Sequence, residues 1–225
     1  MTRSAVVVLS FLVALCCSAY ATSDEFLTFQ GLLDSQQVGN FYNGAGLPGT
    51  PNFGVSFSPN IYALWSTDKG GSGNYRSSQT PLGNPVIYVS APQNGAAATG
   101  IMNATNGFST GLNFYYSAAF AGIQNTTVTI WSGANGTGTV LASITLANND
   151  SSCNPISFCT WTSIGALFSG TAHSVTFAGP ANTFGLTDIT LGSSQTAIPE
   201  PSTLLLVGAG LVGVSFGRVR RYFRP

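Results

Sequence analysis

The residues most suggestive of catalysis form a Gly-x-Ser-x-Gly pattern at positions 107–111, with Asp150 and His173 further along the chain. A serine, an acid and a histidine in this order occur in α/β-hydrolases, where a strand turns sharply into a helix at the serine. No helical period follows Ser109, and such patterns arise by chance in a chain with 27 glycines. We therefore expect no serine hydrolase triad.

Other catalytic and metal patterns are also weak. His173 is the only histidine, and the acids are scattered, whereas a glycosidase needs two paired carboxylates. Asp68 and Asn74, which flank a glycine-rich stretch, and Asp188 carry oxygens of the kind that bind Ca²⁺, although a reading as solvated loop residues explains them better. We predict that the chain is not an enzyme and has no cofactor, structural calcium being the one alternative.

A Gly-x-Gly-x-x-Gly pattern at 208–213 satisfies the dinucleotide-binding spacing. The chain ends twelve residues later without the acidic residue that such a site requires. Small residues that allow close packing of a membrane helix explain this pattern better.

Aromatic side chains are the remaining candidates for ligand contacts, because their flat faces can stack on sugar rings. The candidates are Trp65, Trp131, Trp161, Tyr115 and Tyr116. Most of them are expected in the core, with a minority exposed.

The N-terminus has the form of a secretory signal peptide. Arg3 precedes an apolar run from position 5 to 15, and Ala19-Tyr20-Ala21 supplies small residues at cleavage spacing. Residues 1–21 are therefore predicted to be removed on export. Cys16 raises a lipoprotein alternative, but the large Leu15 before it does not fit the usual cleavage pattern.

Two cysteines, Cys153 and Cys159, remain after this removal. An even number of cysteines in an exported chain predicts one disulfide between them, with two reduced thiols as the alternative.

The C-terminus combines three features in order. Pro199-Glu200-Pro201 is an extended tripeptide, residues 204–217 are uncharged and apolar, and a basic tail follows. The tail contains Arg218, Arg220, Arg221 and Arg224. An apolar helix followed by arginines is a stop-transfer signal that leaves the tail in the cytoplasm and the preceding chain outside it. An ordinary C-terminal anchor with a proline-bearing stalk is the alternative.

This arrangement resembles the PEP-CTERM sorting signal of bacterial surface proteins. The resemblance implies that exosortase, a membrane enzyme, recognises the tripeptide and processes the chain there. It implies an exported protein that is first anchored in the inner membrane and then reaches the cell surface or the extracellular space. The stretch 185–191 also resembles the terminal strand of jelly-roll carbohydrate-binding modules, although no residue-level ligand motif matches.

Between its two ends, the chain shows a period of two and no sustained helical period. Strands are predicted near 26–29, 53–57, 85–90, 112–118, 160–163, 174–177 and 184–191. A hairpin is predicted over 126–146, with Asn135-Gly136 in its turn. These short strands predict an all-β fold: a single antiparallel, jelly-roll-like β-sandwich over 22–191, flanked by a signal helix and a transmembrane helix. A flexible linker is predicted over 192–198, before the sorting signal at 199–225.

Charge excludes one class of partner. Only 6% of the residues are charged. Residues 22–198 contain two bases and six acids, a net charge of −4, which argues against nucleic acid. We predict a non-catalytic surface or extracellular-matrix protein, with an extracellular carbohydrate-binding module as the alternative.

Overall fold

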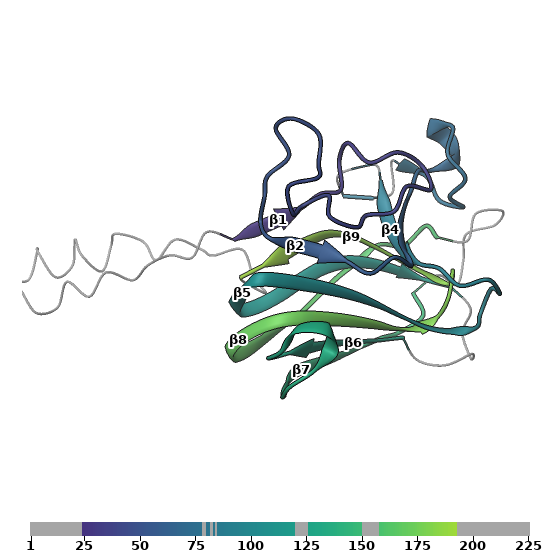
Figure 1. Ribbon diagram of the computed structural model, residues 1–225. Helices are drawn as coiled ribbons and strands as arrows, with labels where there is room; N and C mark the ends of the chain where they lie inside the picture. Colours follow the sequence, from purple (N-terminus) through teal and green to yellow (C-terminus); the bar gives the residue numbers. More distant parts are fainter. Residues whose placement is uncertain are drawn as a thin grey trace, which may run out of the picture.

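The computed structural model describes residues 24–192 except 78, 79, 82, 84, 120–125 and 150–157. These residues form an all-β antiparallel structure with two short 3₁₀ turns (Figure 1). The strands are β1 Glu25–Leu27, β2 Val55–Phe57, β3 Ile61–Leu64, β4 Val86–Val89, β5 Ala97–Ala118, β6 Thr126–Trp131, β7 Val140–Leu146, β8 Thr162–Pro180 and β9 Phe184–Leu191. The 3₁₀ turns are η1 Thr67–Lys69 and η3 Ala134–Gly136.

The two longest strands, β5 and β8, form an antiparallel pair shared by both layers of a β-sandwich. The first half of β5 pairs with β2 and with the second half of β8, which continues to β6 and β7. The second half of β5 pairs with the first half of β8 and with β9, which continues to β4 and β3. The register shifts between Asn103 and Phe108 and again between Ser109 and Gly111, so the change of layer coincides with irregular pairing.

Alternation along the strands places one face of each layer in a common core. Phe114 on β5, Phe177 on β8 and Ile189 on β9 are fully buried. Burial of each such side chain contributes about 1.5–3 kcal/mol relative to exposure in water. The polar residues that alternate with these apolar residues in the sequence therefore lie on the outward faces of the same strands.

Two outer edges of the sandwich are covered by the segment 35–42. The backbone N–H of Ala63 on β3 donates to Gln36 O (2.8 Å), and that of Phe57 on β2 donates to Gly39 O (2.8 Å). These hydrogen bonds satisfy strand-edge groups that would otherwise remain open to solvent or to another chain.

The structure confirms the all-β antiparallel prediction and the hairpin, which consists of β6 and β7. It corrects the expectation of uniformly short strands. The stretch 112–118 is only the end of β5, and the stretches near 160–163 and 174–177 lie largely within one strand, β8. Strand β3 was not predicted. Within the described ranges no helix is long and apolar enough to cross a membrane, and both predicted terminal helices lie outside those ranges.

Candidate functional site

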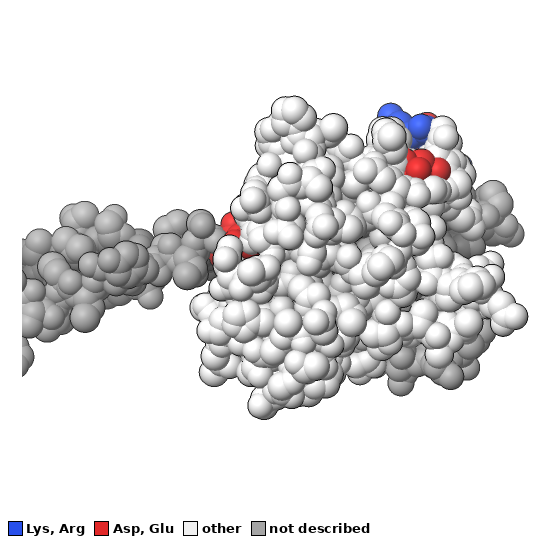
Figure 2. Space-filling view, in the orientation of Figure 1, with Lys and Arg blue, Asp and Glu red and all other residues white. Residues whose placement is uncertain are grey.

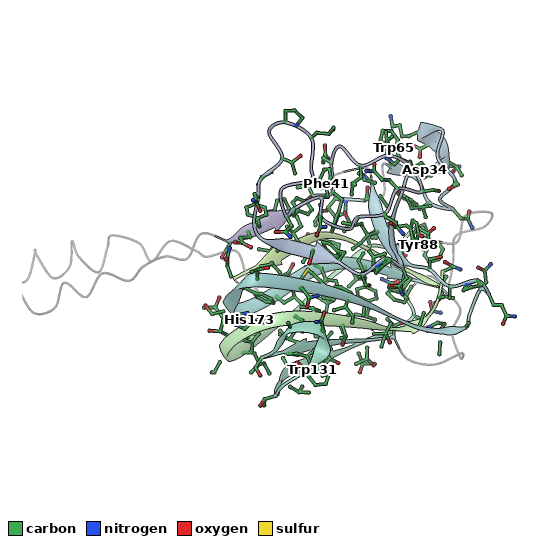
Figure 3. The ribbon with its side chains drawn as sticks, viewed as in Figure 1. Asp34, Phe41, Trp65, Tyr88, Trp131 and His173 are labelled. Carbon is green, nitrogen blue, oxygen red and sulfur yellow. The ribbon has the colours of Figure 1, made fainter. Side chains whose placement is uncertain are left out.

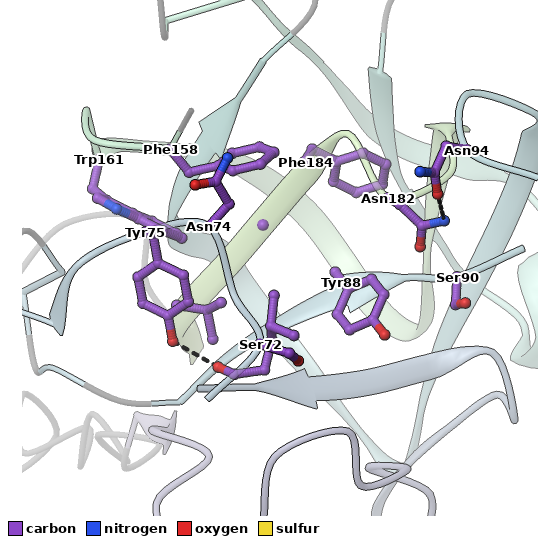
Figure 4. Close-up of a pocket in the computed structure, with 13 residues that line it drawn as sticks. Ser72, Asn74, Tyr75, Tyr88, Ser90, Asn94, Phe158, Trp161, Asn182 and Phe184 are labelled. Atoms are coloured by element: carbon purple, nitrogen blue, oxygen red, sulfur yellow. Dashed lines mark hydrogen bonds between the residues drawn. The ribbon is translucent and has the colours of Figure 1, made fainter. Parts of the chain in front are cut away.

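A cleft of about 400 Å³ lies on the outer face of the layer that contains β3, β4 and β9 (Figure 4). Its polar lining residues are Ser72, Asn74, Ser90, Asn94 and Asn182, and its aromatic lining residues are Tyr75, Tyr88, Phe158, Trp161 and Phe184. Its volume falls within the range of small-molecule sites, about 300–1,000 Å³.

Strand β4 provides part of the floor because its side chains alternate between the two faces. Ile87 and Val89 point into the core, whereas Val86 and Tyr88 line the cleft. Opposite Tyr88, β9 carries Gly185. A Cβ atom at this glycine would lie 3.0 Å from Cη2 of Trp161, so the missing side chain lets the indole lie close against the strand.

One end of the cleft is aromatic. The rings of Trp161 and Tyr75 meet edge to face, with centroids 5.8 Å apart and an interplanar angle of 65°. The Tyr75 hydroxyl donates to Leu64 O (2.6 Å), and burial raises the pKa of this phenol, so that it stays a neutral donor. Trp161 is half-buried, and its indole N–H has no acceptor among the described residues. The indole nitrogen is itself shielded from solvent, so this end offers an aromatic surface to a ligand.

The wall at this end is the loop that follows β3, and Asp34 holds it in place. One carboxylate oxygen of Asp34 accepts from the Trp65 backbone N–H (2.7 Å). The other oxygen accepts from the N–H of Ser72 (3.2 Å) and from its hydroxyl (2.9 Å). Since Ser72 and Asn74 both line the cleft, this carboxylate shapes the site without lining it.

A second carboxylate, Asp68, holds the far end of the same loop. Its two oxygens accept from the N–H (2.9 Å) and hydroxyl (2.7 Å) of Ser77. Hydrogen bonds from the backbone and then the side chain of Ser77, followed by one from Ser66, lower the pKa of Asp68 well below its usual range. The anchor therefore stays charged at neutral pH.

The opposite end of the cleft carries amides. The side-chain N–H of Asn182 donates to Asn94 Oδ1 (2.6 Å) and to Ala91 O (3.4 Å). Figure 4 shows this pair near Ser90, with the Trp161 and Tyr75 rings on the other side of the cleft. Burial, followed by proximity to Tyr62 and Asp34, raises the pKa of Tyr88, which keeps its hydroxyl neutral.

None of the described residues that line the cleft is charged. The face shown in Figure 2 is almost entirely uncharged, with basic and acidic atoms gathered at one corner and a further acidic group beside the chain end. Stacking surfaces and neutral hydrogen-bonding groups are therefore the chemistry that this cleft offers.

Of the five aromatic candidates, only Trp161 lies in the cleft. The indole N–H of Trp65 donates to Leu32 O (2.9 Å), and that of Trp131 donates to Thr176 Oγ1 (3.0 Å). Figure 3 shows Trp65 and Trp131 at opposite ends of the molecule. Tyr115 is half-buried, and Tyr116 is buried.

Among the described cleft residues, sequence reasoning proposed only Trp161 and Asn74, and it missed Tyr88, Asn94 and Asn182 among others. The alternation of Val86, Tyr88 and Ser90 was a usable signal for Tyr88, because it places all three on one face of a strand. The two asparagines carried no such signal.

The calcium candidates lie in different settings. Asp68 and Asn74 belong to the cleft-wall loop, where the Asp68 oxygens accept hydrogen bonds from Ser77. Asp188 is buried in β9 with a positive φ of 53°. No group of three or more His, Cys, Asp or Glu suited to a metal occurs in the described part of the chain.

Ser109 lies within β5 and not on a strand-to-helix turn. It lines a second hollow, of about 390 Å³, together with Glu25 and Thr171. A ring nitrogen of His173 lies 3.3 Å from Ala104 O, and Asp150 is outside the described residues. The geometry of a nucleophile elbow is therefore absent at this serine.

Two other predicted sites, the disulfide and the sorting signal, lie partly or wholly outside the described ranges. Cys159 is disulfide-bonded, but Cys153 is outside, so the pairing of these two cysteines stays a prediction. The tripeptide 199–201 and the arginines of the tail are outside as well.

Several solved structures are similar to this chain. A carbohydrate-binding module of Cellvibrio mixtus lichenase 5A, solved with cellotriose, is 13% identical, covers 76% of this chain and 97% of its own, and has a TM-score of 0.39. A cleaved adhesin domain of Lys-gingipain from Porphyromonas gingivalis is 12% identical, covers 76% and 98%, and has a TM-score of 0.42. A family 6 carbohydrate-binding module is 15% identical, covers 61% and 86%, and has a TM-score of 0.37.

No curated protein matches the chain. A family model does match its end: the PEP-CTERM protein-sorting motif, over residues 197–221. This motif implies export, surface sorting and processing by exosortase. The chain therefore carries a PEP-CTERM protein-sorting motif at its C-terminus.

Proposed function

We propose that this protein is a non-catalytic surface or extracellular-matrix protein whose jelly-roll-like body binds a neutral polysaccharide in the cleft on β3, β4 and β9. The observation that carries the proposal is the combination of aromatic rings with amides and hydroxyls in a cleft whose described lining carries no charge. The sorting motif supports it by placing the body outside the cytoplasm, where polysaccharides occur.

The chemistry of a neutral sugar matches this lining. The C–H faces of a pyranose ring are apolar and pack against aromatic rings, for which Trp161 and Tyr88 are available. Its hydroxyls both donate and accept hydrogen bonds, as do the amides of Asn94 and Asn182. A uronic acid or sulfated sugar would bring a charge into a cleft whose described lining residues include no cation.

The C-terminal motif determines how the protein reaches the cell surface or the extracellular space. We infer that residues 204–217 anchor the precursor in the inner membrane, with the arginines of the tail in the cytoplasm. The extended tripeptide around Glu200 is then presented to exosortase just outside the bilayer.

A purely structural or adhesive role is the second candidate. The hydrogen bonds that tie Trp65 and Trp131 to their own body favour it, since these indole N–H groups are already satisfied. Under this alternative, the cleft would bind no glycan.

The test is a glycan array on the purified full chain in detergent, followed by calorimetric titration with the strongest neutral oligosaccharide. Trp161→Ala is expected to weaken binding by about tenfold or more, the scale of an aromatic hot spot. Trp131→Ala at the other end of the molecule is the matched control and should bind normally. If the protein binds no neutral glycan on the array, or if both variants bind the oligosaccharide with equal affinity, the proposal is contradicted.

A further inference from the structure

A row of side chains continues from the cleft across the outer face of the sheet. Directly opposed residues of neighbouring antiparallel strands lie on the same face. Gly185 on β9 is opposed to Tyr88 on β4, and Tyr88 is opposed to Tyr62 on β3. Beyond β3, Gln37 forms an isolated antiparallel bridge with Tyr62. The row therefore runs from the glycine against which the Trp161 indole lies to an amide outside the cleft.

Tyr62 and Gln37, at the outer end of this row, lie beside the cleft and are accessible to a ligand. Tyr62 is half-buried, and Gln37 is exposed. The ring centroids of Tyr62 and Tyr88 lie 6.1 Å apart with an interplanar angle of 34°, so aromatic side chains continue from the cleft onto β3. The side-chain N–H of Gln37 donates to the Tyr62 hydroxyl (3.2 Å) and to Pro59 O (2.8 Å). These hydrogen bonds hold the amide beside the phenol.

We propose that the ligand of the cleft is an extended, linear neutral glycan that crosses the strands along this row, with one sugar unit bound at Tyr62 and Gln37. This inference rests on the proposed function and names the class of glycan. The spacing of the row supports it, because neighbouring strands lie about 4.8 Å apart, close to the length of one hexose unit in an extended chain. Successive sugar units can therefore meet successive side chains, whereas a disaccharide would leave the outer end of the row uncovered.

The outer end of the row offers the same chemistry as the cleft. The Tyr62 ring provides apolar surface for the C–H groups of a sugar, and its hydroxyl and the Gln37 amide both donate and accept hydrogen bonds. Neither side chain carries a charge. Because Gln37 is already held by two hydrogen bonds, little of its side-chain freedom is lost when a sugar binds. Affinity is therefore expected to rise with the length of the glycan until the row is covered.

Calorimetric titration of the full chain in detergent with linear oligosaccharides of two to six units tests the inference. The probes are the β-1,4-linked glucose, mannose and xylose series. Tyr62→Ala should weaken binding of the longer probes by about tenfold and leave the affinity for the disaccharide unchanged. Trp161→Ala should weaken binding at every length, and Trp131→Ala, at the other end of the molecule, is the control that should bind as the wild type does.

The outcomes separate this inference from the proposed function. If wild-type affinity does not rise with length, or if Tyr62→Ala binds the longest probe as tightly as the wild type, the extended ligand is overturned and the cleft remains a glycan site. If no probe of any series binds, the proposed function fails and this inference fails with it. A thermal scan confirms that each variant is folded. Gln37→Ala changes an exposed side chain and should show the same dependence on length with a smaller loss, which keeps the test decisive if Tyr62→Ala is unstable.

Discussion

The two carboxylates nearest the cleft act on the protein's own backbone. Asp34 and Asp68 each accept hydrogen bonds from a serine that belongs to the cleft-wall loop. The donors of these hydrogen bonds are neutral N–H and O–H groups. The loop in turn supplies Ser72, Asn74 and Tyr75 to the lining.

The lowered pKa of Asp68 predicts a pH-dependent contribution to stability. A carboxyl whose pKa is lower in the folded state stabilises the fold fully above its unfolded pKa, about 4, and loses that contribution as the pH falls toward the folded value. Asp68→Ala should therefore melt below the wild type at pH 7, and the gap should narrow steadily below pH about 4. The check is the melting temperature of both proteins from pH 7 to pH 2.5. A gap that is constant with pH would show that the charge does not matter.

At the scale of elements, the β6–β7 hairpin was predictable because its signal is local. Its turn contains Asn135 with a φ of 55° and Gly136 with a φ of 69°, the left-handed conformations that these two residue types tolerate best. The Asn135 side chain also accepts a hydrogen bond from Asn103 (2.8 Å), whose own side-chain oxygen accepts from the Asn135 backbone N–H (2.7 Å).

This turn gives a second stability prediction. Asn135→Ala should lower the free energy of unfolding by about 1–2 kcal/mol, because alanine pays the steric cost of the left-handed region. Asn135→Gly is the control: it also loses the Asn103 contact but tolerates the backbone, so its loss should be smaller. Denaturant unfolding of both variants measures the difference. The reverse order would show that the side-chain contact dominates over the backbone.

The lengths of β5 and β8 were not predictable in the same way. The sequence predicted a strand only from 112 onward and none over 107–111, which contains two glycines. In the structure Gly107 and Thr110 have positive φ, and the ladder between β5 and β8 continues past them with shifted register. Residues 107–111 alone would end a strand. They remain part of β5 because β5 and β8 pair regularly on both sides of them.

At the scale of the whole molecule, a β-sandwich that carries a neutral cleft precedes a sorting motif. The first and last described residues lie close together: a Cβ on Gly192 would be 2.9 Å from a carboxylate oxygen of Asp24. The chain therefore enters and leaves the sandwich at one place, and β9 contributes to the cleft from its opposite end, through Phe184 and Gly185.

The sorting motif gives a prediction about processing. Glu200→Ala should leave the protein inserted in the membrane but unprocessed, because the carboxylate is the charge that a cationic pocket of the enzyme can recognise. Replacing all four tail arginines with alanine should disturb insertion itself. Mature mass and membrane association, measured in a host that carries exosortase, separate the two effects. Trimming of Glu200→Ala at the wild-type rate would mean that the C-terminus is only an anchor.

The sequence by itself determined the features that depend on neighbouring residues. The sorting motif is a linear pattern, and the β6–β7 hairpin is defined by its turn and its alternation, so both can be read without a fold. The tertiary structure decided the cleft. Tyr88, Trp161 and Asn182 are distant in the chain and meet only because β4 and β9 are adjacent and Gly185 admits the indole. Which tryptophan contacts a ligand depends on long-range packing, and no local pattern encodes it.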